Sequence, residues 1–386
     1  MYKIKTYNKI SKSGLEVFDD KYTIGDEVEN ADGAIVRSAA LHDEEFPASL
    51  QAIARAGAGT NNIPIDRCSE QGIVVFNTPG ANANAVKELV IAGLLLSSRR
   101  VVSGIEWAKT LKGEGDAVGK LVEKGKGAFA GPEIKGKKLG VIGLGAIGVM
   151  VANAANHLGM TVYGYDPYLS VKSAWNLNHN AVHINDINEI FANCDYITIH
   201  VPLTDSTKNL INADTLAKCK EGVRILNFSR AALVNDADLK AALESGKVAA
   251  YVTDFPTDDV LGVDGVIAIP HLGASTPESE DNCASMAAKE LMDYIENGNI
   301  VNSVNLPEVT MPRSGENRVC VIHKNIPNMI TAITGIFAGD NINIENLLNK
   351  SRSDYAYTML DICGADISAV AEKIGAIDGV IRVRVI

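Results

Sequence analysis

Three glycines at the end of a short apolar segment restrict what this chain of 386 residues can fold into. Gly143, Gly145 and Gly148 follow the apolar run 138–142, which predicts a strand, and they open a segment with helical spacing. In such a strand–loop–helix unit the first glycine makes a tight turn, the second lets a pyrophosphate approach the backbone, and the third packs the helix on the strand. The pattern therefore predicts a dinucleotide-binding unit.

An acidic residue supports this interpretation and indicates which dinucleotide is bound. Asp166 follows the next predicted strand, 161–165. A carboxylate at this place binds both ribose hydroxyls and repels a 2′-phosphate, so we expect NAD rather than NADP. The start of the helix, at Ala146 and Ile147, would offer N–H groups to the phosphates.

The rest of the chain predicts an α/β protein with two doubly wound parallel sheets, which are Rossmann-like. The first part has strands at 34–36 and 72–77 and a helix at 85–100. The Gly- and Lys-rich segment 112–138 has little periodicity and predicts a surface crossing between domains. Five strands follow, at 138–142, 161–165, 196–200, 224–228 and 266–269.

A third, smaller unit ends the chain. A helix at 278–297 and a loop at 304–317 precede the order β-α-β-β-α-β, which is typical of a ferredoxin-like fold. Its predicted strands are 319–322, 342–344, 355–362 and 380–386, and its helices are 328–338 and 366–376. We predict a discontinuous substrate-binding domain (1–95 and 276–303), an NAD-binding domain (96–275), a linker (304–317) and a C-terminal domain (318–386).

Composition excludes several classes of protein. The net charge of -11 disfavours a nucleic-acid surface, which needs a basic excess. The six cysteines have no metal-site spacing, so we expect free thiols and no metal. No stretch approaches the ~18 apolar residues of a membrane span, and the N-terminus does not resemble a signal peptide. We therefore expect a cytoplasmic protein without membrane or nucleic-acid partners.

Three polar residues follow the later strands, at the edge where parallel sheets bind ligands. Arg230 is suited to bind a carboxylate while polarising a carbonyl. His271 can exchange a proton with a hydroxyl or carbonyl oxygen near neutral pH. Asp258 is a candidate partner that would hold the imidazole. Each of the three also has a structural explanation, as a surface residue, a helix cap or a turn.

Six segments in this order resemble the D-isomer-specific 2-hydroxyacid dehydrogenase family, and within it the branch with a C-terminal ACT domain. They are 55–63, 77–82, 143–148, 200–204, 227–230 and 271–276. The resemblance implies NAD-dependent oxidation of 3-phospho-D-glycerate to 3-phosphohydroxypyruvate, the first step of L-serine biosynthesis. The alternatives are a dehydrogenase for another D-2-hydroxy acid and a non-catalytic, corepressor-like NAD sensor.

The resemblance also implies roles for individual residues. Arg230 and His271 act in catalysis, and Asp258 stands where the family usually has Glu. An ungapped register places Thr253 at the family's nicotinamide-side Asp, and we favour the neighbouring Asp254. The implied cofactor-binding residues are Gly143, Gly145, Ala146, Ile147, Gly148, Asp166, His200, Val201, Pro202, Phe228, Ser229, Arg230, Asp254 and Gly273.

For the substrate, the resemblance implies binding by Arg230 and His271 together with a group in the first domain. That group comprises Arg37, Ser38, Gly57, Gly59 and Asn82. We expect Arg37 to bind the phosphate as the only cation in those loops. A second cation would come from Lys120, Lys124 or Lys126.

For the C-terminal domain, the resemblance implies an ACT module that binds L-serine between paired subunits. His323, Asn325 and Asn343 match the effector-binding positions. Asn328 stands where the family has Gly, and asparagine tolerates a left-handed backbone. The alternative is a dimerisation unit without an effector site. A homodimer or homotetramer is expected.

Overall fold

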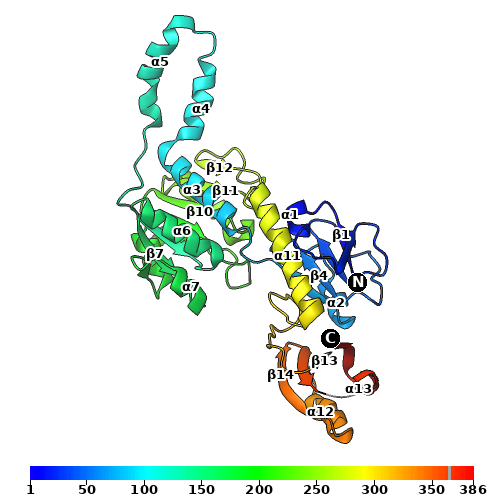
Figure 1. Ribbon diagram of the computed structural model, residues 1–386. Coiled ribbons are helices and arrows are strands. Elements are labelled where there is room, and N and C mark those ends of the chain that lie inside the picture. Colours follow the sequence, from blue (N-terminus) through cyan, green and yellow to red (C-terminus); the bar gives the residue numbers. More distant parts are fainter. Residues whose placement is uncertain (364–366) are drawn as a thin grey trace. The chain divides into compact units, whose positions relative to one another are not determined.

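The computed structural model describes residues 1–363 and 367–386. Two compact units make up the chain (Figure 1): unit 1 contains residues 1–81 and 277–386, and unit 2 contains residues 82–276. Among the described residues, none of the helices has both the length and the apolar character needed to cross a bilayer.

Unit 1 begins with a five-stranded parallel sheet in the order β2-β1-β3-β4-β5. Its helix α11 packs on the sheet through small apolar residues, and it lies so close to helix α1 that a Cβ on Gly14 of α1 would overlap Ala284. The strands are β1 (Tyr2–Tyr7), β2 (Tyr22–Gly25), β3 (Gly33–Val36), β4 (Ala52–Arg55) and β5 (Val74–Asn77), and the helices are α1 (Lys12–Leu15), α2 (Ile65–Glu70) and α11 (Pro277–Asn297).

Unit 2 contains a seven-stranded parallel sheet in the order β12-β11-β10-β9-β6-β7-β8. The strands are β6 (Lys138–Ile142), β7 (Thr161–Tyr165), β8 (Val182–His183), β9 (Tyr196–Ile199), β10 (Val223–Asn227), β11 (Val248–Thr253) and β12 (Val266–Ala268). Besides the two helices of the arm described below, its helices are α3 (Ala83–Arg99), α6 (Ala146–His157), α7 (Val171–Asn176), α8 (Ile187–Asn193), α9 (Ala213–Lys218) and α10 (Asp236–Glu244). The sequence predicted five of these strands. It missed β8, which has only two exposed residues, and β11, whose two alanines give a weak strand signal.

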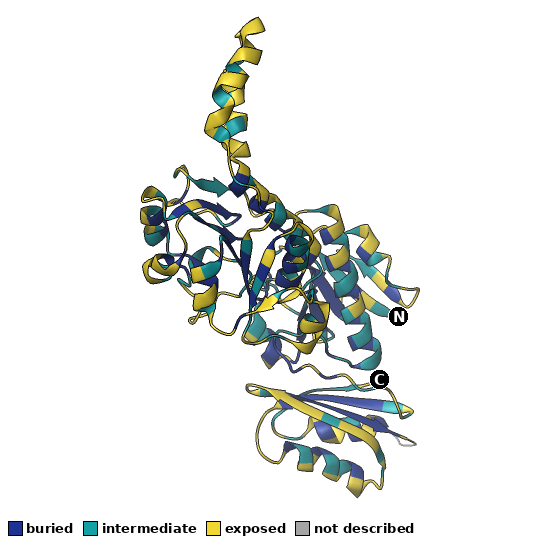
Figure 2. Cartoon of the chain, turned by 90° about the vertical axis from the view of Figure 1, so that its left-hand side faces the viewer, coloured by how far each residue is buried: buried dark blue, intermediate teal, exposed yellow. Residues whose placement is uncertain are grey.

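The prediction of an irregular crossing at 112–138 was wrong. Helix α4 (Val101–Thr110) and helix α5 (Val118–Gly125) form a hairpin that projects from unit 2 as an arm (Figure 1). The rings of Trp107 and Phe129 pack with centroids 5.2 Å apart and hold the hairpin together. Most of the arm is exposed (Figure 2). Helix α5 has only 8 residues, and Gly119 and Gly125 weaken the helical signal of its sequence.

The C-terminal sheet confirms the ferredoxin-like prediction. Its antiparallel order is β14-β15-β13-β16. The elements are β13 (Asn317–Lys324), α12 (Met329–Gly339), β14 (Ile344–Arg352), β15 (Tyr355–Ile362), α13 (Ile367–Gly375) and β16 (Val380–Val385). Position 366 of the predicted helix lies outside the described residues. Asn328 adopts a φ of 69°, as predicted for the position that takes Gly in the family.

This sheet shares a hydrophobic core with the first part of unit 1. Cys320 and Tyr357 pack in the same cluster as Tyr294 of α11. The Arg384 guanidinium donates to the carbonyl oxygens of Tyr294 and Ile295, at the end of that helix. The domain boundaries drawn from the sequence stay a prediction.

Candidate active site

The loop between β6 and α6 has the geometry that a dinucleotide needs. Gly143 has a φ of 93°, and a Cβ there would lie 2.5 Å from the carbonyl oxygen of His200. A Cβ on Gly148 would overlap the carbonyl oxygen of Gly143. A Cβ on Gly145 would meet no atom within 4 Å, so the surface at this glycine is open. Gly145 is also the N-cap of α6, so the first N–H groups of the helix have no capping side chain.

Asp166 lies next to this loop, at the end of β7. Its carboxylate accepts the N–H of Leu144 at 2.8 Å and the N–H of Tyr168 at 2.8 Å. Each oxygen keeps a lone pair, because a carboxylate oxygen can accept two hydrogen bonds. The carboxylate is therefore held beside the glycine loop and can still accept ribose hydroxyls. An open glycine, an uncapped helix end and this carboxylate together fit NAD.

The other predicted cofactor residues of this sheet follow β9 and β10. His200, Val201 and Pro202 follow β9, and burial lowers the pKa of His200 to about 4, so its imidazole is neutral. Ser229 donates to the carbonyl oxygen of Ile199 at 2.7 Å, which ties the two strand ends together. Asn82, predicted for the substrate, is the N-cap residue of α3.

The structure brings Arg230 and His271 together around one aromatic ring. The guanidinium carbon of Arg230 lies 5.4 Å from the ring centroid of Phe255. The imidazole of His271 packs on the same ring with centroids 4.3 Å apart. Asn227, which is fully buried, donates to the carbonyl oxygen of Arg230 at 2.9 Å and fixes the backbone there. Phe255 and Asn227 were not singled out from the sequence, although Asn227 lies within the segment 227–230.

Asp254 is the carboxylate that faces this group. It is 1% exposed, and its Oδ2 accepts the N–H of Gly273 at 3.3 Å. Burial raises the pKa of Asp254, while the charges of His271 and Arg230 and the N–H of Gly273 act in the opposite direction. Its Oδ1 is buried without a hydrogen-bond partner among the described residues. Thr253, the alternative, accepts the N–H of Phe255 at its hydroxyl.

The structure does not bring Asp258 to His271. Asp258 is exposed and makes no hydrogen bond to the imidazole in the described part of the chain. It lies in a turn where Thr257 accepts the N–H of Val260 at its carbonyl, and Thr257 is tied to Asp236 at 2.7 Å. The role of Asp258 as the partner of His271 therefore stays a prediction, and this geometry favours Asp254.

In unit 1, the predicted substrate residues lie at the ends of β3 and β4. Arg37 and Ser38 follow β3, and Asn8 accepts the N–H of Ser38 at 3.2 Å. Gly57 has a φ of 142°, and its carbonyl oxygen accepts the N–H of Thr78. Gly59 is partly exposed in the same loop.

The expectation that Arg37 is the only cation in these loops was wrong. Arg55 ends β4, and its Nε donates to the carbonyl oxygen of Arg37 at 3.1 Å. Its guanidinium lies against Gly57, where any Cβ would overlap it. Burial and the charge of Arg37 lower the pKa of Arg55. Arg37 and Arg55 are therefore two neighbouring cations in this part of unit 1. Arg55 is the first residue of the segment 55–63 and was treated there as part of the motif alone. Lys120, Lys124 and Lys126 lie on the arm of unit 2 and remain candidates for further cations.

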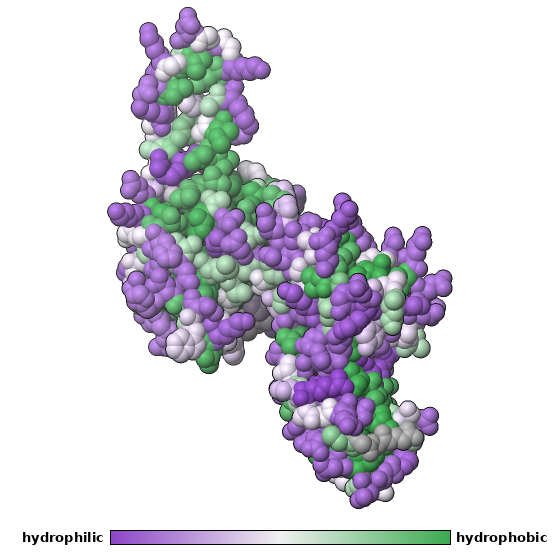
Figure 3. Space-filling model, in the orientation of Figure 1, coloured by the Kyte–Doolittle hydropathy of each residue, from purple (hydrophilic) through white to green (hydrophobic). Residues whose placement is uncertain are grey.

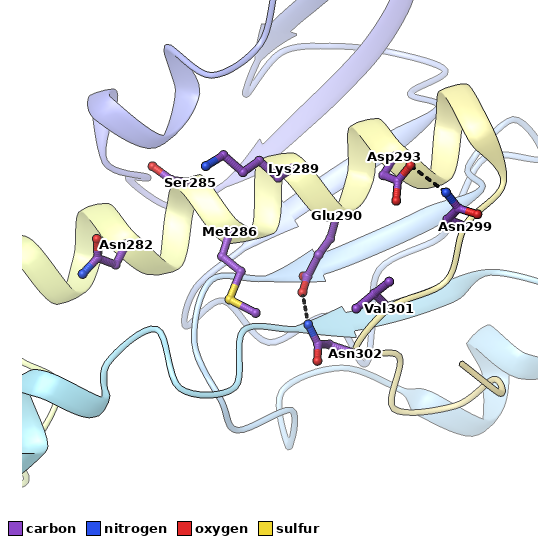
Figure 4. Close-up of a pocket in the computed structure, with 9 residues that line it drawn as sticks. All are labelled: Asn282, Ser285, Met286, Lys289, Glu290, Asp293, Asn299, Val301 and Asn302. Atoms are coloured by element: carbon purple, nitrogen blue, oxygen red, sulfur yellow. Dashed lines mark hydrogen bonds between the residues drawn. The ribbon is translucent and has the colours of Figure 1, made fainter. Parts of the chain in front are cut away.

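A separate cavity lies along α11 (Figure 4). Its volume is about 460 Å³, and Glu290 points from the helix toward the loop that carries Val301 and Asn302. Glu290 Oε1 accepts from the Asn302 amide at 2.7 Å, whereas Oε2 is buried without a partner among the described residues. Burial raises the pKa of Glu290 to about 8.

The three predicted effector residues differ in how far they are buried and in which groups they contact. His323 is 2% exposed, and its ring nitrogens contact the carbonyl oxygen of Lys324 and the hydroxyl of Thr358. Asn325 donates to the carbonyl oxygen of Ser353. Asn343 is exposed and lines a cavity of about 440 Å³ beside α12.

Comparison with known proteins gives consistent matches. Residues 92–273 match the NAD-binding domain of the D-isomer specific 2-hydroxyacid dehydrogenases. The chain is 34% identical over 340 residues to D-3-phosphoglycerate dehydrogenase from Haemophilus influenzae, covering 85% of this chain and 79% of the relative. It is 33% identical to the enzyme of the same name from Bacillus subtilis, covering 80% of this chain and 60% of the relative.

A solved structure gives a similar result. The NAD⁺-bound 3-phosphoglycerate dehydrogenase from Entamoeba histolytica matches with a TM-score of 0.60 and 26% identity, covering 79% of this chain and 98% of that one.

Proposed function

Because the chain belongs to the D-isomer-specific 2-hydroxyacid dehydrogenase family, and is therefore an NAD-binding oxidoreductase of 2-hydroxy acids, we propose that its substrate is 3-phospho-D-glycerate. The proposed product is 3-phosphohydroxypyruvate, and the reaction would supply L-serine biosynthesis. The observation that carries the proposal is that the Arg55 guanidinium lies against Gly57 and is close enough to Arg37 to be affected by its charge. Two neighbouring guanidinium groups suit a phosphate dianion. The names of the relatives support the same substrate.

The residues around Phe255 divide the work on the substrate. Arg230 binds the carboxylate and polarises the oxygen on C2. His271 takes the proton of the C2 hydroxyl as C2 becomes a carbonyl carbon. The glycine loop and Asp166 would hold NAD, which would supply the hydride acceptor for C2. Asp254 stabilises the positive charge that His271 gains, and Phe255 keeps the imidazole in place.

A substrate comparison tests this proposal. We expect NADH formation with 3-phosphoglycerate at a kcat/KM at least about 100-fold above that with D-glycerate or D-lactate, since charged partners add roughly 1.5–3 kcal/mol each. A higher kcat/KM with an unphosphorylated acid would assign the chain to another 2-hydroxy acid. No NADH formation with any of these acids would favour the corepressor-like alternative.

The arm of unit 2 supports the proposal of a homo-oligomer. It exposes five aliphatic side chains, and hydrophobic surface gathers where the arm joins the unit (Figure 3). The five are Val101, Val102, Ile105, Val118 and Val122. Such a patch on a projecting hairpin is typical of a protein–protein contact, and we propose a second copy of this chain as the partner.

Replacing an apolar residue of the arm should dissociate the oligomer. Ile105 is 50% exposed in this monomer, and Ile105→Asp would place a charge in the proposed contact. We expect light scattering to report a smaller species for this variant at micromolar concentration. Lys112→Asp, which adds an acidic group to the same arm outside its apolar residues, should keep the wild-type mass. Equal masses for the two variants would contradict the proposed contact.

L-serine remains the proposed effector of the C-terminal domain. Asn343 supports this proposal because it is exposed beside a cavity. His323 supports it less, since its ring is buried and engaged at both nitrogens. The substrate comparison above is therefore repeated with L-serine added.

A further inference from the structure

Arg37 is the residue that we propose to bind the substrate phosphate, and it already forms an ion pair with a carboxylate of its own chain. Its Nη2 lies 2.6 Å from Oε1 of Glu280. Both side chains are partly exposed, at 42% for Arg37 and 40% for Glu280. This contact has the short length of a charge-assisted hydrogen bond, yet water reaches both partners.

Glu280 is held in this position by the helix that carries it. It lies in the first turn of α11, where the partial positive charge of the helix N-terminus favours an acidic side chain. The same helix packs on the sheet that ends in Arg37 and Arg55. Glu280 therefore lies beside the loop that follows β3 and carries Arg37.

The pair can be exchanged for a ligand. An ion pair between partly exposed groups contributes little to stability, because water and salt screen it. A phosphate dianion attracts a guanidinium more strongly than a single carboxylate does, and it can use two N–H groups at once. A phosphate next to Glu280 would also be repelled by the carboxylate.

We propose that Glu280 is an internal competitor for Arg37, a positioning residue that the phosphate of the substrate displaces. This inference rests on the proposed function, since it takes the anion at Arg37 to be the substrate phosphate. The competition weakens binding of phosphorylated ligands and aids their release, because Glu280 recaptures Arg37 as the phosphate leaves. A substrate without a terminal anion leaves the pair intact.

The test compares Glu280→Gln with Glu278→Gln in the full-length protein. Glu278 lies in the same helical turn but is exposed, so its variant makes the same charge change without affecting Arg37. We expect Glu280→Gln to lower KM for 3-phosphoglycerate about fivefold, the effect of removing one exposed ion pair. KM for D-glycerate should stay unchanged, and Glu278→Gln should behave as wild type. An unchanged or raised KM for 3-phosphoglycerate in Glu280→Gln would overturn the proposal.

A second measurement separates this proposal from the proposed function. If 3-phosphoglycerate is not oxidised by the wild type, the proposed function fails, and thermal stabilisation by inorganic phosphate then tests the competition. Glu280→Gln should be stabilised at lower phosphate concentrations than wild type, and Arg37→Gln should lose the stabilisation. Equal phosphate responses in wild type and Glu280→Gln would overturn the competition.

Discussion

Replacing His271 with alanine should lower kcat by about 100-fold or more, the usual contribution of a general acid–base group. The imidazole is the group near Arg230 that can take the hydroxyl proton, and the two side chains share the ring of Phe255. Loss of the imidazole removes proton transfer, but Arg230 can still bind the carboxylate of the substrate. We therefore expect a modest change in KM, measured by NADH formation at saturating substrate.

NADH binding separates this role from a structural one. The contacts that position the glycine loop and Asp166 do not include His271. The Kd for NADH from fluorescence titration should therefore stay within about twofold of wild type. His179→Ala, at an exposed histidine of the same unit, serves as the control and should leave kcat unchanged. A His271→Ala variant with wild-type kcat would remove His271 from the mechanism. A parallel loss of NADH binding would indicate a structural role.

The sequence predicts the cofactor loop well because backbone geometry alone determines it. Gly143 needs a positive φ and Gly148 has no room for a Cβ, so these positions leave a pattern that one sequence displays. The ferredoxin-like sheet is equally visible, since its two central strands, β13 and β15, are buried along almost their whole length and read as largely apolar runs. Both features depend on residues that are close together in the sequence, and the periodicity and spacing of residues reveal features of this kind.

The parts that the sequence did not predict depend on contacts between distant segments. Arg55 meets Arg37 only because β3 and β4 are neighbours in the sheet. Glu280 reaches Arg37 across 243 positions of the chain. Whether Asp254 or Asp258 lies near His271 depends on the conformation of the turn after β11. Residue types and spacing alone do not predict this conformation. Helix α5 of the exposed arm has only 8 residues, two of them glycines, and this weakens the helical signal of its sequence.

Glu290 should make the stability of the protein fall as pH rises. Burial raises the pKa of this carboxyl to about 8 in the folded protein, from a usual value of 4.5. Between these pH values the folded chain holds a proton that the unfolded chain has lost, so the stabilising contribution is complete below about pH 4.5 and is lost as pH rises toward 8. The loss over this window is on the order of 5 kcal/mol.

The variant Glu290→Gln removes this dependence, because glutamine keeps the oxygen that accepts from Asn302 and does not ionise. We expect denaturant unfolding to show the variant gaining stability over wild type as pH rises from 5 to 8.5, by up to about 1.4 kcal/mol per pH unit. Lys289 and Asp293, the other charged residues that line the same cavity, are unchanged in the variant. Glu278→Gln should follow the wild-type pH profile, since Glu278 is exposed. A difference between Glu290→Gln and wild type that is independent of pH would show that Glu290 ionises normally in the folded protein.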